Sequence, residues 1–255
     1  MMRRVLAPSG GWRAWAAALL LLLSPAVPAG AMTDDLLGRL GCGVLPSASM
    51  PWQLTPRDDG PLRILVIGSS STSGTGAGEA AAAYPTRTMA HLSAKMAVEL
   101  VAHGVGGERA TGALARLGPL LRETRPHLLV WQVGTNDARG RVPLAELAMT
   151  LRTGIAQARA AAAAVVLVDP QYYPSVASDR HYRATVAEIA AVARQEGTGL
   201  VQRFARMERA EALGPAAMTR MLARDRFHMS ALGHECLARD LSARILAAQG
   251  TVADG

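Results

Sequence analysis

Side chains able to carry out nucleophilic catalysis lie in two short segments of this 255-residue chain. Ser70 is part of a glycine- and hydroxyl-rich stretch that spans 68–78, and Asp225 precedes His228 by three residues. A carboxylate at that spacing can accept the Nδ1–H of the imidazole and fix its tautomer, which leaves the other ring nitrogen free to take a serine proton. Each segment alone is common by chance. Together they favour a serine nucleophile with a histidine base.

The glycine-rich stretch departs from three better-known loop motifs. It holds no lysine, which a Walker phosphate loop requires, and Glu79 stands where a dinucleotide fingerprint beginning at Gly74 needs its last glycine. Thr72 interrupts the Gly-x-Ser-x-Gly pattern of a lipase elbow. What remains is a Gly-x-Ser sequence directly after an apolar run, which suits a nucleophile at the end of a strand.

Two further segments could donate hydrogen bonds to a substrate oxygen. Asn136 lies within 134–137, directly after another apolar run, and its side-chain amide is a donor. The alternative for a lone asparagine is an ordinary turn. Glycines within 104–108 allow close approach of the backbone, so that an N–H could point at a substrate, although a plain turn explains them as well.

The elements that must position these residues follow from the hydrophobic pattern. Apolar runs typical of strands buried on both faces occur at 64–67, 128–133 and 164–168. A short stretch at 97–102 is a weaker strand candidate, and 200–201 opens a short fifth strand. Apolar residues recur at helical spacing over 110–123, 143–162, 182–196 and 231–248. This alternation predicts an α/β domain with a parallel sheet covered on both faces. The active site of such a sheet lies beyond the carboxyl ends of its strands.

The order Gly-x-Ser, Gly, Asn and Asp-x-x-His, each at or beyond a predicted strand end, resembles the SGNH hydrolases, also called the GDSL esterases. The resemblance covers the chain from Leu62 onward. It implies a flavodoxin-like three-layer α/β/α fold with about five parallel strands. It also implies hydrolysis of carboxylic esters through an acyl-enzyme, without a metal or an organic cofactor.

The resemblance assigns roles to five residues. Ser70 is the expected nucleophile, and Asp225 and His228 complete the triad. The main-chain N–H groups of Ser70 and Gly107 and the side chain of Asn136 are the expected donors of the oxyanion hole.

The sequence departs from the family pattern at three positions. Ser69 replaces the aspartate of the Gly-Asp-Ser signature, so Ser71 is a second candidate for the nucleophile. Ala102 replaces an asparagine that often precedes the second glycine block, and Met229 replaces a proline that often follows the catalytic histidine. None of these changes removes a group that the chemistry requires.

The composition excludes several other classes of protein. Half of the residues are hydrophobic and 18% are charged, which is typical of a globular domain. The formal charge of +7 falls to +4 when the arginines of the N-terminal segment are left out, and the remaining arginines are scattered, so no nucleic-acid partner is expected.

His234 and Glu235 do not extend to a zinc-binding His-Glu-x-x-His, because Ala238 occupies the last position.

The N-terminal residues 1–31 have the layout of a signal peptide. Basic residues precede a ten-residue apolar run at 14–23, which is shorter than the ~20 residues that cross a membrane. Small residues before Ala31 fit a cleavage site, with Ala26 and Ala29 as alternatives. We therefore expect a periplasmic or secreted protein without a stable membrane anchor after cleavage, with an N-terminal arm at 32–60 and the hydrolase domain at 61–250.

Cys42 and Cys236 are the two cysteines of the chain. In an oxidising compartment an even pair favours a disulfide, which here would join the N-terminal arm to the last helix. The alternative is two separate buried thiols.

The predicted activity is that of a secreted serine esterase acting on a small-molecule or glycan ester with an acetyl or other short acyl group. Two alternatives are an O-acyltransferase that uses the same triad on glycans and a catalytically silent glycan-binding module on the same fold. The segment 169–173 follows the fourth predicted strand, where it either lines the substrate cleft or forms a plain loop.

Overall fold

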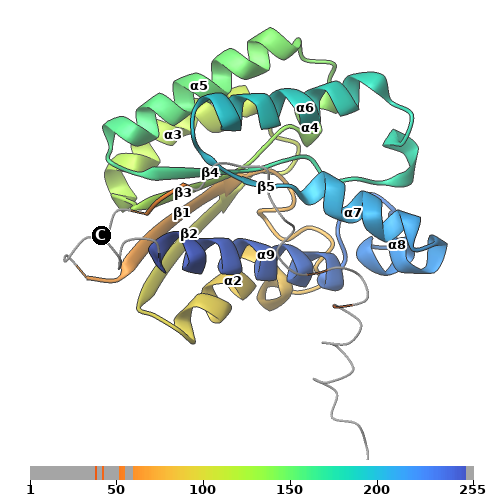
Figure 1. Cartoon of the computed structure of the whole chain (residues 1–255), viewed down its shortest axis with the longest axis horizontal. Coiled ribbons are helices and arrows are strands. Elements are labelled where there is room, and N and C mark those ends of the chain that lie inside the picture. The colour runs from red at the N-terminus through yellow and green to blue at the C-terminus, as the bar shows by residue number, and fades with distance from the viewer. Residues whose placement is uncertain (1–37, 39–41, 43–51, 55–59, 251–255) are drawn as a thin grey trace, which may run out of the picture.

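The computed structural model describes residues 38, 42, 52–54 and 60–250, which contain one five-stranded parallel sheet in the order β2-β1-β3-β4-β5 (Figure 1). The strands are β1 (Leu62–Gly68), β2 (Val98–Gly104), β3 (Leu128–Gln132), β4 (Ala164–Val168) and β5 (Gly199–Val201). β1 pairs with both β2 and β3, so the first strand lies inside the sheet rather than at its edge. The predicted α/β class and parallel sheet are therefore confirmed.

Helices cover both faces of the sheet (Figure 1). One layer contains α3 (Ala110–Thr124), α5 (Leu144–Ala160) and α6 (Arg180–Gln195), with the short α4 (Thr135–Arg139) beside it. The other layer contains α2 (Tyr84–Ser93) and α9 (Ala231–Gly250), with α7 (Arg203–Ala212) and α8 (Pro215–Met221) at one end. Two single 3₁₀ turns, η1 (Ala80–Ala82) and η2 (Pro174–Val176), lie in the connections.

Each face of the sheet has its own hydrophobic core because successive side chains of a strand point to opposite faces. Leu65 and Ile67 pack in the cluster that includes residues of α3, α5 and α6. Ile64 and Val66 pack in the other cluster, which includes residues of α2 and α9. All four side chains are buried, which explains why this strand reads as a continuous apolar run rather than an alternating one.

The N-terminal arm reaches the domain at the few positions that the structure describes. The predicted disulfide is present, with Cys42 and Cys236 Sγ atoms 2.02 Å apart. Leu54 donates a main-chain hydrogen bond to Ala248, and Trp52 lies against Gly199 at the start of β5. These contacts attach the beginning of the described chain to α9 and to the edge of the sheet.

The predicted signal peptide at 1–31 lies outside the described residues, as does most of the arm at 32–60. The boundaries at residues 31 and 60 stay predictions. Among the described helices, none is both long enough and apolar enough to cross a membrane.

Candidate active site

The nucleophile loop, residues 69–75, follows β1 at the carboxyl end of the sheet. It folds into a tight turn, in which Thr72 and Ser73 N–H groups donate to the Ser69 carbonyl and Thr75 N–H donates to the Ser70 carbonyl. Gly68 must lack a side chain here, because a Cβ would lie 2.4 Å from Thr72 Oγ1. The turn therefore begins immediately at the end of β1, and its second residue, Ser70, is partly exposed.

Of the three consecutive serines that begin this turn, Ser70 is the one that faces the histidine. Its Oγ lies 3.1 Å from His228 Nε2. Ser69 is buried, and its N–H donates to Gln132 Oε1 at 2.9 Å. Ser71 is also buried, with its Oγ 3.2 Å from Gln171 Oε1. The geometry thus places Ser70, and neither neighbour, where the imidazole could take its proton.

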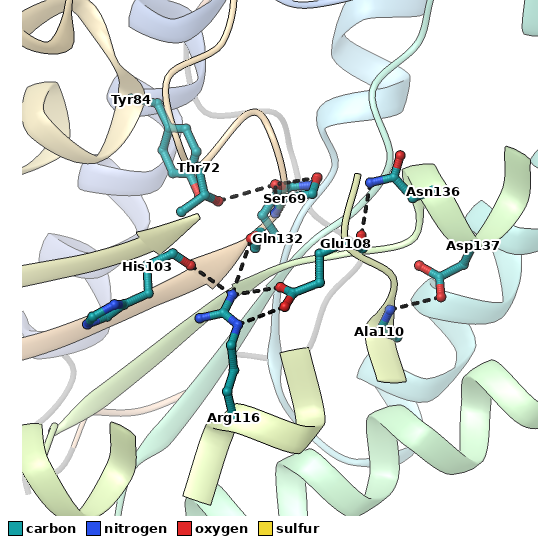
Figure 2. A network of polar contacts seen from close by, with 11 residues as sticks. Ser69, Thr72, Tyr84, His103, Glu108, Ala110, Arg116, Gln132, Asn136 and Asp137 are labelled. Atoms are coloured by element: carbon teal, nitrogen blue, oxygen red, sulfur yellow. Dashed lines mark hydrogen bonds and ion pairs between the residues drawn. The ribbon is translucent and has the colours of Figure 1, made fainter. Parts of the chain in front are cut away.

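The inner side of the nucleophile loop contacts β3 and α2. Thr72 Oγ1 lies 3.2 Å from Gln132 Oε1 and 2.8 Å from the Tyr84 hydroxyl (Figure 2). Burial raises the pKa of Tyr84 to about 12, against smaller opposing effects of Thr72 and Arg203. Tyr84 therefore stays neutral and acts as a hydrogen-bonding support for the loop.

The histidine loop, residues 222–229, is closed by an antiparallel bridge between Leu222 and Met229, just before α9. Asp225 Oδ2 lies 2.6 Å from His228 Nδ1, and Asp225 Oδ1 accepts from the N–H groups of Phe227 and His228. An ionised carboxylate can only accept hydrogen bonds, so Nδ1 carries the proton and Nε2 is left free to accept from Ser70.

The electrostatics of Asp225 suit this arrangement. Partial burial acts to raise the pKa of Asp225, but the hydrogen bonds from His228 and from the Phe227 and His228 N–H groups outweigh it, and the pKa lies below its usual value. Asp225 therefore stays ionised and holds the imidazole in one tautomer.

The predicted oxyanion donors come from the loops after β2 and β3. Gly107 has φ +77°, a left-handed conformation that favours glycine, and it is exposed. Within the described residues neither its N–H nor that of Ser70 donates a hydrogen bond. One amide N–H of Asn136 donates to the Glu108 carbonyl at 2.9 Å, which leaves its second N–H available (Figure 2).

An ion pair holds the loop that carries Gly107. Arg116 of α3 donates through Nε and Nη2 to the two carboxylate oxygens of Glu108, at 2.8 and 2.7 Å, and also donates to the His103 carbonyl at the end of β2 (Figure 2). A two-point contact of this kind fixes orientation as well as distance. Sequence reasoning missed this pair, because nothing in the spacing of Glu108 and Arg116 marks them as partners of a glycine loop.

Asp137 supports the same region from α4. It is buried, and its Oδ1 accepts from the Ala110 N–H at 2.9 Å, which ties the start of α3 to α4 (Figure 2). Burial raises the pKa of Asp137, and hydrogen bonds from main-chain N–H groups oppose the shift.

The segment 169–173 is largely buried and is not a plain exposed loop. Asp169, Gln171 and Tyr172 are buried, and burial raises the pKa of Asp169 to about 7, while Phe204 N–H and Arg203 act in the opposite direction. Arg203 is itself fully buried and donates to the Asp169 carbonyl at 2.9 Å. Sequence reasoning missed Arg203, because it follows β5 in a segment with no motif.

The described residues contain no group of three or more histidine, cysteine, aspartate or glutamate side chains that could hold a metal ion. His234 instead lies buried between two backbone groups, accepting from the Tyr84 N–H at 3.2 Å and lying 3.3 Å from the Thr75 carbonyl. It acts as a structural link between α9, α2 and the nucleophile loop.

Known proteins share this fold and parts of this sequence. Esterase TesA of Pseudomonas aeruginosa is 40% identical over 101 residues, which are 39% of this chain and about half (49%) of that relative. A crystal structure of TesA superposes with a TM-score of 0.64 and 27% identity, covering 73% of this chain and 99% of that one. Axe2, an acetylxylan esterase from Geobacillus stearothermophilus, shares the fold, with a TM-score of 0.62 and 24% identity over 74% of this chain and 96% of its own.

The sequence profile of the Non-GDSL lipase-like family matches residues 53–251, which is most of the chain. That match agrees with Ser69 standing in place of the signature aspartate. The solved structures that share the fold include a lipolytic protein described as of the G-D-S-L family. The chain belongs to the Non-GDSL lipase-like family, among the SGNH/GDSL-type ester hydrolases that its sequence resembles.

Proposed function

We propose that this protein is a secreted serine esterase that hydrolyses carboxylic esters with acetyl or other short acyl groups through an acyl-enzyme. The observation that carries the proposal is the continuous hydrogen-bonded series from Asp225 through His228 to Ser70, with separations of 2.6 and 3.1 Å. Both distances lie within the range over which a proton can pass between a nucleophile, its base and the group that orients the base.

The mechanism follows from the donors and acceptors of these three side chains. His228 Nε2 takes the Ser70 proton as Ser70 Oγ bonds to the ester carbonyl carbon, and the carbonyl oxygen becomes an oxyanion. The imidazolium, stabilised by Asp225, returns that proton to the departing alcohol oxygen as the ester C–O bond breaks. A water molecule then repeats the sequence on the acyl-enzyme and releases the carboxylic acid.

The oxyanion is stabilised by N–H groups that make no other hydrogen bond within the described residues. The N–H groups of Ser70 and Gly107 make no hydrogen bond within the described residues, and Asn136 has one spare amide N–H. Donors held in place before the reaction stabilise the transition state without a cost of reorganisation. The Glu108–Arg116 ion pair and the Asn136–Glu108 hydrogen bond supply the rigidity that this requires.

Two features support export. The described residues include a disulfide between Cys42 and Cys236, and disulfides persist in oxidising compartments. The residues before the domain have the order of a signal peptide, with basic residues, an apolar run and small residues. A small-molecule or glycan ester met in the periplasm or outside the cell is therefore the proposed substrate.

The test is hydrolysis of p-nitrophenyl acetate together with labelling by a fluorophosphonate, on the mature protein and on Ser70→Ala. We expect Ser70→Ala to lose both, since a removed triad nucleophile lowers turnover by several orders of magnitude. Ser178→Ala, which changes an exposed serine of a loop, is the matched control and should keep both. Labelling that persists in Ser70→Ala would reject Ser70 as the nucleophile.

A further inference from the structure

Gln171, which follows β4, contacts three of the four segments that hold the proposed catalytic groups. It is 1% exposed, so water does not compete for its hydrogen bonds. Its Oε1 lies 3.2 Å from Ser71 Oγ, its Nε2 lies 2.7 Å from the Phe227 carbonyl, and its N–H lies 3.4 Å from Thr135 Oγ1. These three partners are the direct sequence neighbours of Ser70, His228 and Asn136. The Tyr182 hydroxyl donates to the Gln171 carbonyl at 2.6 Å and fixes the backbone.

The hydrogen bonds of this network can run in only one direction. Arg203 has no acceptor atoms, so its Nη1, 3.0 Å from Ser71 Oγ, must donate. Ser71 must then give its single proton to Gln171 Oε1. This orients the amide so that Gln171 Nε2 donates to the Phe227 carbonyl. The sequence of hydrogen bonds therefore runs from a buried cation under the nucleophile loop to the peptide bond that joins Phe227 to His228.

The histidine loop makes few hydrogen bonds to the body of the domain, although the Phe227 ring packs against Tyr173 and Arg139. Within the described residues, the hydrogen bonds of 223–228 stay inside this segment, with two exceptions. One exception is the His228–Ser70 contact itself, and the other is the Gln171–Phe227 hydrogen bond. Any drift of this loop would change the separation of Nε2 and Oγ, on which proton transfer depends.

We propose that Gln171 is a positioning residue that holds the Phe227 carbonyl and the Ser71 hydroxyl and so keeps His228 in line with Ser70. The proposal rests on the proposed function, because it concerns the geometry of that triad. Gln171 acts through its neighbours and does not touch the substrate.

The decisive variant is Gln171→Glu. When the introduced carboxyl is protonated, it keeps the acceptor and the donor with which the Gln171 amide contacts Ser71 and Phe227. When it is ionised it has no donor, and it places negative charge against the Phe227 carbonyl. We therefore expect its kcat relative to wild type to fall as pH rises across about pH 5–8, a window in which a buried carboxyl can titrate.

Gln171→Met is the companion variant, because it keeps the volume and removes both hydrogen bonds. We expect kcat for p-nitrophenyl acetate to fall by about 10- to 100-fold at every pH, with little change in KM, since a misplaced base slows chemistry more than binding. Fluorophosphonate labelling should slow by a similar factor.

Asp240→Asn is the control for destabilisation alone. Asp240 is fully buried and pairs with Arg206 and Arg244, and neither arginine belongs to the catalytic loops. This variant should lower the melting temperature and leave the pH dependence of kcat unchanged.

Each outcome decides a separate point. Wild-type hydrolysis and labelling that are lost in Ser70→Ala support the proposed function, and a pH-dependent kcat ratio in Gln171→Glu then supports the role of Gln171. Full kcat in Gln171→Met, or a Gln171→Glu variant as active as wild type at every pH, would overturn that role and leave the proposed function intact. A wild type that neither hydrolyses nor labels would overturn both.

Discussion

Three consecutive serines at the end of β1 differ in what their side chains contact. Ser69 bonds to Gln132 and Ser71 to Gln171 and Arg203, and both are buried. The remaining serine, Ser70, is partly exposed and lies against His228. One tight turn thus gives neighbouring residues of the same type opposite environments.

Asn136 is the side chain through which the oxyanion hole is most directly tested. We expect Asn136→Ala to lower kcat by about 10²–10³, the usual effect of losing one such donor, with a much smaller effect on KM. Steady-state kinetics with p-nitrophenyl acetate and a thermal melt measure the two consequences. The melt should change little, because only the hydrogen bond to the Glu108 carbonyl is lost from the fold.

The matched variant is Asn136→Asp, which keeps the shape and the carbonyl oxygen and removes the amide donors. It should lose as much activity as the alanine variant, because the donor and not the volume is what the oxyanion needs. Full activity in either variant would contradict the proposed role of Asn136.

Among individual residues, the sequence predicted the side chains proposed to touch substrate but not the side chains that support them. Asp225 and His228 are close in sequence, and their contact could be anticipated from spacing. Gln171 meets Phe227 across 56 positions, and Arg203 meets Ser71 across 132. Such partners carry no local signal, because only the folded chain brings them together.

The predictability of each element follows its burial. β1, β3 and β4 are buried over most of their length and read as apolar runs. The edge strand β2 has no buried residue and includes Glu99, so its apolar signal was weak and its observed end, Gly104, lies two residues later than predicted. α7 begins with the buried Arg203 and has several charged residues, which hid its helical period.

His234 connects α9 to α2 and to the nucleophile loop, and its charge state matters to all three. Burial lowers the pKa of His234 to about 4, with Arg203 and Arg87 acting in the same direction and the Thr75 carbonyl opposing them. The ring is therefore neutral in the folded protein, with Nδ1 accepting from the Tyr84 N–H.

The consequence is a loss of stability in mild acid. The unfolded chain binds a proton at His234 with the ordinary pKa of about 6.5, whereas the folded chain does so only near 4. Stability from this group is present above about pH 6.5 and is lost as pH falls toward 4, by up to about 3 kcal/mol. Urea unfolding at a series of pH values measures it.

Substitution should isolate this contribution. His234→Gln cannot titrate, so its free energy of unfolding should fall less steeply between pH 6.5 and 4. His103→Gln is the comparison, since the His103 imidazole makes no hydrogen bond to the described residues. An unchanged slope in His234→Gln would show that another group is responsible.

For the molecule as a whole, the disulfide links the two ends of the described chain across 194 positions. Closing a loop of that length restricts the unfolded chain strongly, and we expect reduction to lower the free energy of unfolding by about 2–5 kcal/mol. Denaturant unfolding with and without a thiol reductant gives the difference. Thiol counts on the denatured protein should find none before reduction and two after.

The Cys42→Ser/Cys236→Ser double variant provides the control. It should unfold at the same denaturant concentration with and without reductant, and should match the reduced wild type. If the free energy of unfolding of the wild type did not change on reduction, the disulfide would contribute nothing to stability.

The same bridge makes the chain between residues 42 and 236 a covalent ring. Ser70, Asn136 and His228 all lie inside that ring. A single peptide-bond cleavage anywhere within it, at exposed loop tips such as those that proteases prefer, would open the ring without separating the pieces. The cleaved protein would still hold its catalytic groups on one molecule. Two fragments on a reducing gel therefore do not imply that the enzyme is inactive.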